Sequence, residues 1–143
     1  MVKKLKTNAL SYWLVIAGVL SFGFTIAHIT GGGDLVHSPI LESELSDELK
    51  GFVSVIWHGI TASMLLCSCL LLISAWRSLH RMVLSLIVAV NYSLFTAIFL
   101  FYGVVRFQSV MVMPQWIGFT GIVLVVLMGL WAEKSTITKV SLS

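Results

Sequence analysis

The chain has 143 residues, of which 58% are hydrophobic and only 10% are charged, and its formal net charge is +3. Its mean hydropathy is +1.00. A soluble domain of this length could not bury so much apolar surface, because small folds leave a large fraction of the chain exposed. The basic residues flank apolar runs instead of forming a stripe, which excludes a nucleic-acid-binding surface. Composition therefore predicts one domain, residues 1–143, embedded among membrane lipids.

Four apolar runs are each close to the roughly 20 residues that a bilayer core requires. They cover residues 12–31, 52–76, 82–102 and 113–131. Lysines precede the first run, but it is too long for a secretory signal and no small-residue cleavage site follows it. The predicted fold class is an all-α integral membrane protein: an up-down four-helix transmembrane bundle whose first helix is a retained anchor.

Basic residues in the short connections predict the orientation of the helices. Most of them fall on one side: Lys3, Lys4, Lys6, Arg77, Arg81, Lys134 and Lys139. The opposite side holds only Lys50 and Arg106, together with five acidic residues. Both termini are therefore predicted to face the cytoplasm, and a bacterial inner (cytoplasmic) membrane is the predicted location.

The first external loop, residues 32–50, is the only connection long enough to have its own structure. The glycines at 31–33 predict a sharp bend, because glycine allows backbone angles that other residues avoid. Ser38 followed by Pro39 predicts the N-cap and first position of a short amphipathic helix. Ser46, followed by two acids, predicts the start of the second spanning helix.

Small and polar residues mark the helix faces that meet inside lipid. In the first span such residues step by three, four and three, which places them on one face: Gly18, Ser21, Thr25 and His28. The second span carries a similar set: Ser54, His58, Thr61 and Ser68. Both stripes reach a histidine near the outer boundary, so His28 and His58 are predicted at similar depth. The spacing leaves open whether the two histidines face each other.

An ionisable side chain inside a membrane span is a functional-site hypothesis by default, because leaving it in lipid is costly. The outer layer of the bundle gives a predicted cofactor-binding set: His28, His58, Tyr102, Arg106 and Gln115. It also gives a predicted metal-binding set: His28, His58, His37 and Asp34.

Several ligands suit these residues. Two facing imidazoles can hold the iron of a haem b axially, with Arg106 near a propionate. The metal set suits a divalent ion such as zinc, and the thioethers of Met111 and Met113 would add affinity for copper. A quinone or a lipid head group could instead be hydrogen-bonded by the same layer. In the alternative without a binding site, each histidine only bonds to a backbone carbonyl or to interfacial water.

Cys67 and Cys69 lie deep in the second span, two residues apart. They are predicted to point to different faces of the helix. We interpret them as small apolar residues instead of a redox pair.

Three functions stay open at this point. The first is a membrane protein with a histidine-containing binding site at its outer face, serving a larger assembly. The second is a structural or accessory subunit, or a homo-oligomer, without a cofactor. The third is a small transporter or lipid-handling protein that uses a polar seam from His28 towards Asn91. No nucleophile–base pair or acid–base constellation is visible, so catalysis by the chain alone is not predicted.

Overall fold

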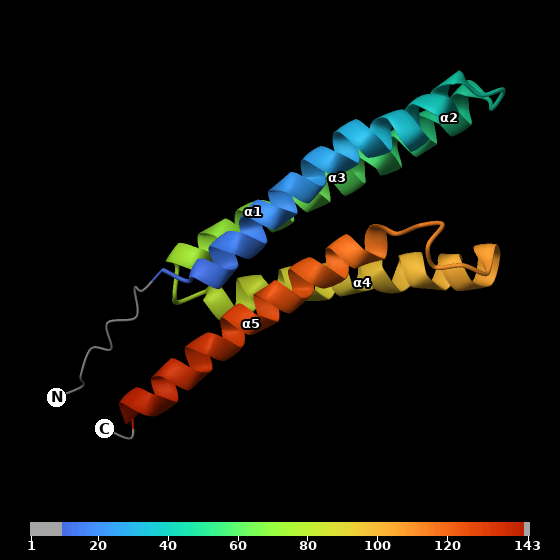
Figure 1. Ribbon diagram of the computed structural model, residues 1–143. Coiled ribbons are helices and arrows are strands. Elements are labelled where there is room, and N and C mark those ends of the chain that lie inside the picture. Colours follow the sequence, from blue (N-terminus) through green and yellow to red (C-terminus); the bar gives the residue numbers. More distant parts are fainter. Residues whose placement is uncertain (1–9, 142–143) are drawn as a thin grey trace.

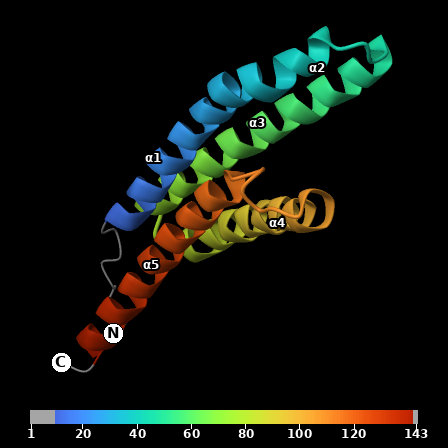
Figure 2. The ribbon, with the colours of Figure 1, turned by 45° about the vertical axis from the view of Figure 1, so that its right-hand side comes forward.

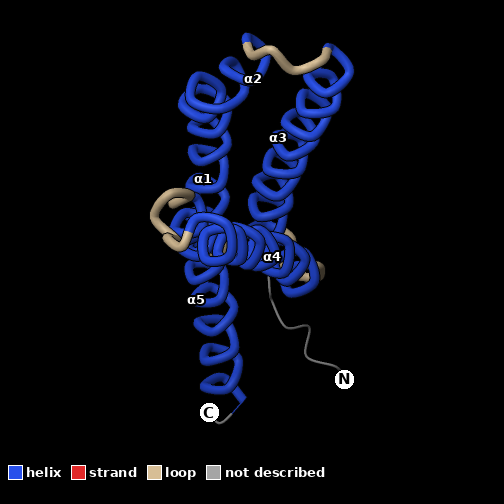
Figure 3. The backbone as a smooth tube through the Cα atoms, turned by 90° about the vertical axis from the view of Figure 1, so that its right-hand side faces the viewer, coloured by secondary structure: helices blue, strands red, loops and turns tan. Residues whose placement is uncertain are grey.

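The structure, a computed structural model, describes residues 10–141 and the side chains of residues 10–133. Within this range the chain is helical apart from short connections (Figure 3). The elements, labelled in Figure 1, are α1 (Tyr12–Ala27), the π-helix η1 (His28–His37), α2 (Ser38–Glu42), α3 (Asp47–Trp76), α4 (Arg81–Phe107) and α5 (Gln115–Ser141). Lys3, Lys4 and Lys6 lie outside the described residues, and Lys134 and Lys139 lie outside the described side chains, so the predicted orientation stays a prediction.

Four helices are long and apolar enough to cross a membrane: Tyr12–Glu42, Asp47–Trp76, Arg81–Phe107 and Gln115–Glu133. The predicted all-α, four-helix bundle is thereby confirmed. The first of these helices has 31 residues, a length of about 46 Å at 1.5 Å per residue. A bilayer core is only about 30 Å thick, so this helix either tilts or extends beyond the hydrocarbon.

The helices form two antiparallel hairpins, α1–η1–α2 with α3 and α4 with α5. We call the end that carries residues 77–80 the turn end, and the end that carries residues 43–46 and 108–114 the loop end. The hairpins contact each other through α1 on α5 and α3 on α4. Figures 1 and 2 show that they meet towards the turn end and diverge towards the loop end, while α5 runs on past the turn end.

The chain does not bend at its three glycines, so that prediction was wrong. Residues 31–33 lie inside η1, no glycine among the described residues has a positive φ, and the change of direction comes at residues 43–46. In lipid every backbone N–H and C=O must be bonded within the protein, which favours a continuous helix over an open bend. Ser38 is therefore not an N-cap, because α2 follows η1 directly.

One predicted local feature of the first hairpin is confirmed. Ser46 caps α3, and its hydroxyl accepts a hydrogen bond from the backbone N–H of Leu49. Residues 78–80 form the tight turn between α3 and α4. The predicted cysteine geometry is also confirmed, since Cys67 is buried, Cys69 is exposed and both are free.

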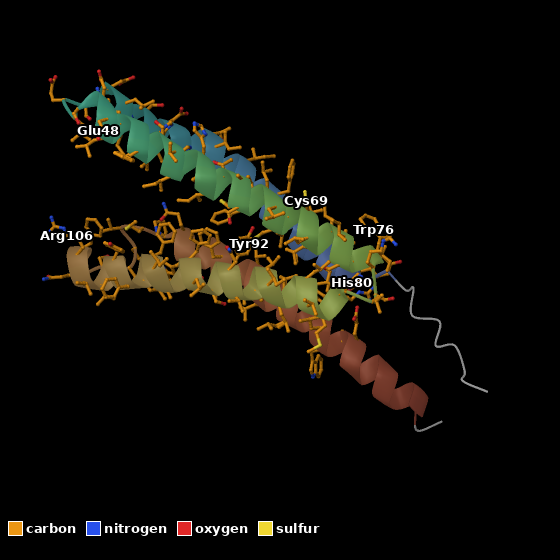
Figure 4. The ribbon with its side chains drawn as sticks, turned by 180° about the vertical axis from the view of Figure 1, so that it is seen from behind. Glu48, Cys69, Trp76, His80, Tyr92 and Arg106 are labelled. Atoms are coloured by element: carbon orange, nitrogen blue, oxygen red, sulfur yellow. The ribbon has the colours of Figure 1, made fainter. Side chains whose placement is uncertain are left out.

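A chain of hydroxyl groups joins three helices in the middle of the core. Ser68 of α3 donates to the carbonyl of Met64 at 2.9 Å, and Ser21 of α1 lies 2.8 Å from the Ser68 hydroxyl and 2.5 Å from that of Tyr92 in α4. Each hydroxyl has one hydrogen. Ser68 must therefore accept from Ser21, and Ser21 must accept from Tyr92. Figure 4 shows Tyr92 where the two hairpins meet.

An aromatic cluster on α5 extends this core towards the loop end. The ring of Phe119 contacts Tyr92, Phe95 and Phe99 of α4, and it meets Phe24 of α1 edge-on with the ring centroids 5.0 Å apart. Beyond this cluster no residue of η1 or α2 is buried. The tightly packed part of the bundle therefore ends about where η1 begins.

A buried arginine joins three helices at the turn end. The Nε of Arg81 donates to the carbonyl of Ser74 at 2.9 Å, and Nη2 donates to that of Ala75 at 2.8 Å. These carbonyls belong to the last turn of α3 and have few partners within the helix. Nη1 forms an ion pair with Glu133 of α5. The Arg81 side chain, at the first residue of α4, thus bonds to the last turn of α3 and to Glu133 of α5.

Candidate functional site at the loop end

The indole ring of Trp57 in α3 stacks with two histidines of η1. The His28 ring lies 4.1 Å from it, centroid to centroid, with an interplanar angle of 21°. The His37 ring lies 5.3 Å from it at an angle of 3°. Because His28 and His37 are two turns apart along η1, they cover opposite faces of the indole.

The π-helix is what brings these two histidines onto one face. His28 and His37 are nine residues apart, which is about two and a half turns of an α-helix and would place them on opposite sides. A π-helix is wider, with roughly 4.4 residues per turn and i→i+5 hydrogen bonds, so nine residues complete about two turns. Such segments are rare and occur frequently at functional sites.

Gly32 makes room for the indole between the two histidines. A Cβ atom at this position would lie 2.9 Å from the Cη2 atom of Trp57, whereas one at Gly31 or Gly33 would meet no atom within 4 Å. Only one of the three glycines is therefore required by packing. It lies four residues after His28 and five before His37, as the π-helical spacing demands.

Two polar groups of α3 meet the edge of His37. Its Nε2 lies 3.0 Å from the hydroxyl of Ser54, and its ring meets that of His58 edge-on with the centroids 5.6 Å apart. The Ser54 hydroxyl also donates to the carbonyl of Lys50 at 2.9 Å, so it accepts from the imidazole. His37 then carries its proton on Nε2.

His28 and His58, the two histidines predicted at similar depth, have different surroundings. His28 is half-buried, and its Nε2 is a buried atom with no hydrogen-bond partner among the described residues. His58 is exposed. Trp57, and not His58, lies on the face of α3 that packs against η1. His58 contacts the site only through His37.

The other members of the predicted cofactor set belong to the second hairpin. Tyr102 and Arg106 lie near the end of α4 and Gln115 begins α5, and all three are exposed. η1 instead packs against α1, α2 and α3. Figure 4 shows Arg106 at the loop end of α4, apart from Glu48 at the start of α3. The structure does not place these three side chains beside the histidine stack.

The predicted metal set is not gathered into a cluster in the described part of the chain. No group of three or more His, Cys, Asp or Glu residues there could hold a metal ion. Asp34 is exposed on η1. Asn91, the other end of the predicted polar seam, is half-buried in α4, and its Oδ1 has no partner among residues 10–133.

Trp57, Gly32 and Ser54 are the site residues that the sequence reasoning did not assign. One signal could have found the first of them. Ser54, Trp57, Thr61, Met64 and Ser68 step by three and four along α3, which is the spacing of one helix face. The spacing of four and five between His28, Gly32 and His37 is the corresponding signal for a π-helix.

Comparison of the chain with protein-family models, with curated proteins and with solved structures found no match.

Replacing Gly32 by alanine should destabilise the first hairpin, because the new methyl group pushes on the Trp57 ring. Alanine at Gly31 or Gly33 meets nothing and should stabilise the helix, by up to about 1 kcal/mol from intrinsic propensity. Unfolding in detergent, followed by far-UV circular dichroism, measures all three. In a Trp57→Leu background the penalty of Gly32→Ala should shrink, and an equal effect of all three alanines would contradict the close approach.

Proposed function

We propose that this chain is a small four-span membrane protein that binds a hydrogen-bonding ligand, a quinone or a lipid head group, at the loop end of its first hairpin. The binding groups are His28, His37 and His58, and the protein holds this ligand for a larger membrane assembly. The observation that carries the proposal is the Nε2 atom of His28, which is buried without a partner among the described residues, in a stack where Trp57 lies between His28 and His37.

A buried polar atom without a hydrogen bond costs about 1–3 kcal/mol. Such atoms are rare in folded proteins, and each one requires a specific reason. A ligand oxygen that bonds to Nε2 would remove this cost. Histidine suits such a role, because its ring nitrogens can donate or accept and its charge changes near neutral pH.

The depth of the site supports a ligand from the membrane boundary. At about 1.5 Å per residue, His28 lies about 24 Å along α1 from Tyr12, and His37 lies further along η1. The site therefore begins short of the roughly 30 Å thickness of a bilayer core and extends towards its boundary. Quinone rings and lipid head groups with their attached chains reach this boundary.

The stacking favours a hydrogen-bonded ligand over haem or a metal ion. Axial ligation of a haem requires two imidazoles that aim their nitrogens at one iron atom. Here His28 and His37 instead lie flat against the faces of Trp57. The Nε2 atom of His37 is paired with Ser54, so the Nε2 atom of His28 is the nitrogen that a hydrogen-bonding ligand would use.

Replacing His28 by phenylalanine tests the proposal, since it keeps a ring against Trp57 and removes Nε2. We expect His28→Phe to weaken binding of a short-chain ubiquinone or of phosphatidylglycerol by about tenfold or more, equivalent to about 1.4 kcal/mol. The same variant should unfold at equal or higher temperature without ligand, because the unpartnered atom is gone. Binding is measured by the shift in thermal midpoint.

His80→Phe is the matched control, because His80 is exposed at the turn end, and Figure 4 shows it at the opposite end of the molecule from Glu48 of the loop end. It should bind both probes as the unchanged protein does. Equal binding by His28→Phe would contradict the proposal. A Soret band in the purified protein that shifts on reduction and disappears in His28→Phe would assign haem to the site instead.

A further inference from the structure

A cavity of about 590 Å³ lies at the turn end, on the opposite side of the molecule from the histidine stack. It is bounded by the start of α1, the connection between α3 and α4, and α5. The residues that matter are apolar Trp13, Leu79 and Ala132, and the charged pair Arg81 and Glu133. The cavity is thus an apolar space with one ion pair in its wall.

The cavity lies at the level where the apolar spans end. Its wall includes Tyr12, the first residue of one candidate span, and Arg81, the first residue of another. Trp13, Trp76 and Trp131 are exposed near this end, as in the aromatic belts at membrane interfaces. A ligand of this cavity therefore comes from the head-group layer.

The charged pair offers a carboxylate oxygen of Glu133 to such a ligand. The Nε, Nη1 and Nη2 atoms of Arg81 are engaged with Ser74, Glu133 and Ala75. The carboxylate of Glu133 uses only Oε1 in this pair, and its side chain is 31% exposed. Its second oxygen, Oε2, can accept a further hydrogen bond. This oxygen accepts its stronger hydrogen bonds from a charged donor.

We infer that this cavity binds the head group of an ethanolamine phospholipid, with the ammonium on Glu133 and the glycerol and upper chains against Trp13 and Leu79. A primary ammonium donates three hydrogen bonds, whereas the quaternary ammonium of a choline lipid donates none. Hydrogen bonds to charged groups are also the stronger ones. The site should therefore distinguish two lipids that differ only in the methylation of the head group.

The test measures bound lipid after purification from an equal mixture of phosphatidylethanolamine and phosphatidylcholine with identical acyl chains. The unchanged protein should retain the ethanolamine lipid in about tenfold excess, equivalent to about 1.4 kcal/mol. Glu133→Gln should reduce the ratio to that of the mixture. Ala132→Leu fills the cavity while keeping both charges, and it should reduce the total amount of bound lipid.

Ala97→Leu is the matched control, because Ala97 is exposed on α4 away from the cavity, and this variant should retain the preference. A ratio equal to that of the mixture in the unchanged protein would overturn the inference. A preference for the ethanolamine lipid that appears only after Lys3, Lys4 and Lys6 are replaced by glutamine would also overturn the inference. That result would mean that the Glu133 carboxylate of the unchanged protein binds the chain's own lysine ammonium groups. Retention of the preference in both Glu133→Gln and Ala132→Leu would place the lipid elsewhere.

Discussion

Arg81→Gln should lower the free energy of unfolding by about 3 kcal/mol, the lower end of the range for breaking a buried ion pair. The substitution removes the ion pair with Glu133 and two hydrogen bonds to the last turn of α3. The remaining carboxylate is partly exposed, which limits the loss. Unfolding in detergent, followed by far-UV circular dichroism, measures the change.

The matched control is Arg77→Gln, because Arg77 is exposed at the same end of the bundle. Surface substitutions of this kind usually change stability by less than about 0.5 kcal/mol. Arg81→Lys should give an intermediate loss, since lysine keeps the charge but not the planar fork of donors. The double variant Arg81→Gln, Glu133→Gln should regain part of the stability. Equal effects of Arg81→Gln and Arg77→Gln would contradict the three-helix role of Arg81.

Tyr92→Ala should destabilise the bundle by about 3–5 kcal/mol, the usual cost of truncating a fully buried aromatic side chain to alanine. Tyr92 has no exposed surface, and its ring packs against Phe119. Its hydroxyl is the last group in the chain of hydroxyls and bonds to Ser21. The substitution leaves a cavity where three helices meet. The thermal midpoint in detergent and the chemical unfolding curve both report this loss.

Two further substitutions separate the ring of Tyr92 from its hydroxyl. Tyr92→Phe keeps the ring and removes one hydrogen bond, so it should cost about 1 kcal/mol, in line with the small values measured inside membrane proteins. Tyr102→Ala removes a tyrosine of the same helix that is 53% exposed, and it should have little effect. A loss in Tyr102→Ala as large as that in Tyr92→Ala would show that α4 is rotated relative to its partners.

The number of helices and several of their ends were predictable, because they depend on local properties. Run length and hydropathy identify a membrane span, since the bilayer fixes how many apolar residues are required. The cap at Ser46 and the turn at residues 78–80 follow from residue chemistry within a few positions. The opposite faces of Cys67 and Cys69 follow from helical geometry alone.

The candidate site was predictable only in part. His28 and His37 do come together, but on Trp57, and His58 contacts only His37, which lies in a helix instead of a loop. The predicted bend treated three glycines as a break, whereas the structure uses Gly32 for close packing. The predicted outer layer placed Tyr102, Arg106 and Gln115 beside the histidines, which requires the two hairpins to lie side by side at the loop end. The hairpins instead diverge there (Figure 2).

The sequence by itself determined that this protein has four apolar helices, where most of them end, and which ionisable residues lie near one boundary. Only the tertiary structure decided which of these residues meet. The physical reason is helix rotation: a change from about 3.6 to about 4.4 residues per turn moves His37 half a turn around the axis relative to His28. The stacking of both histidines on Trp57 joins η1 to a segment of α3 that is distant in the sequence, and residue patterns within η1 do not reveal such a contact.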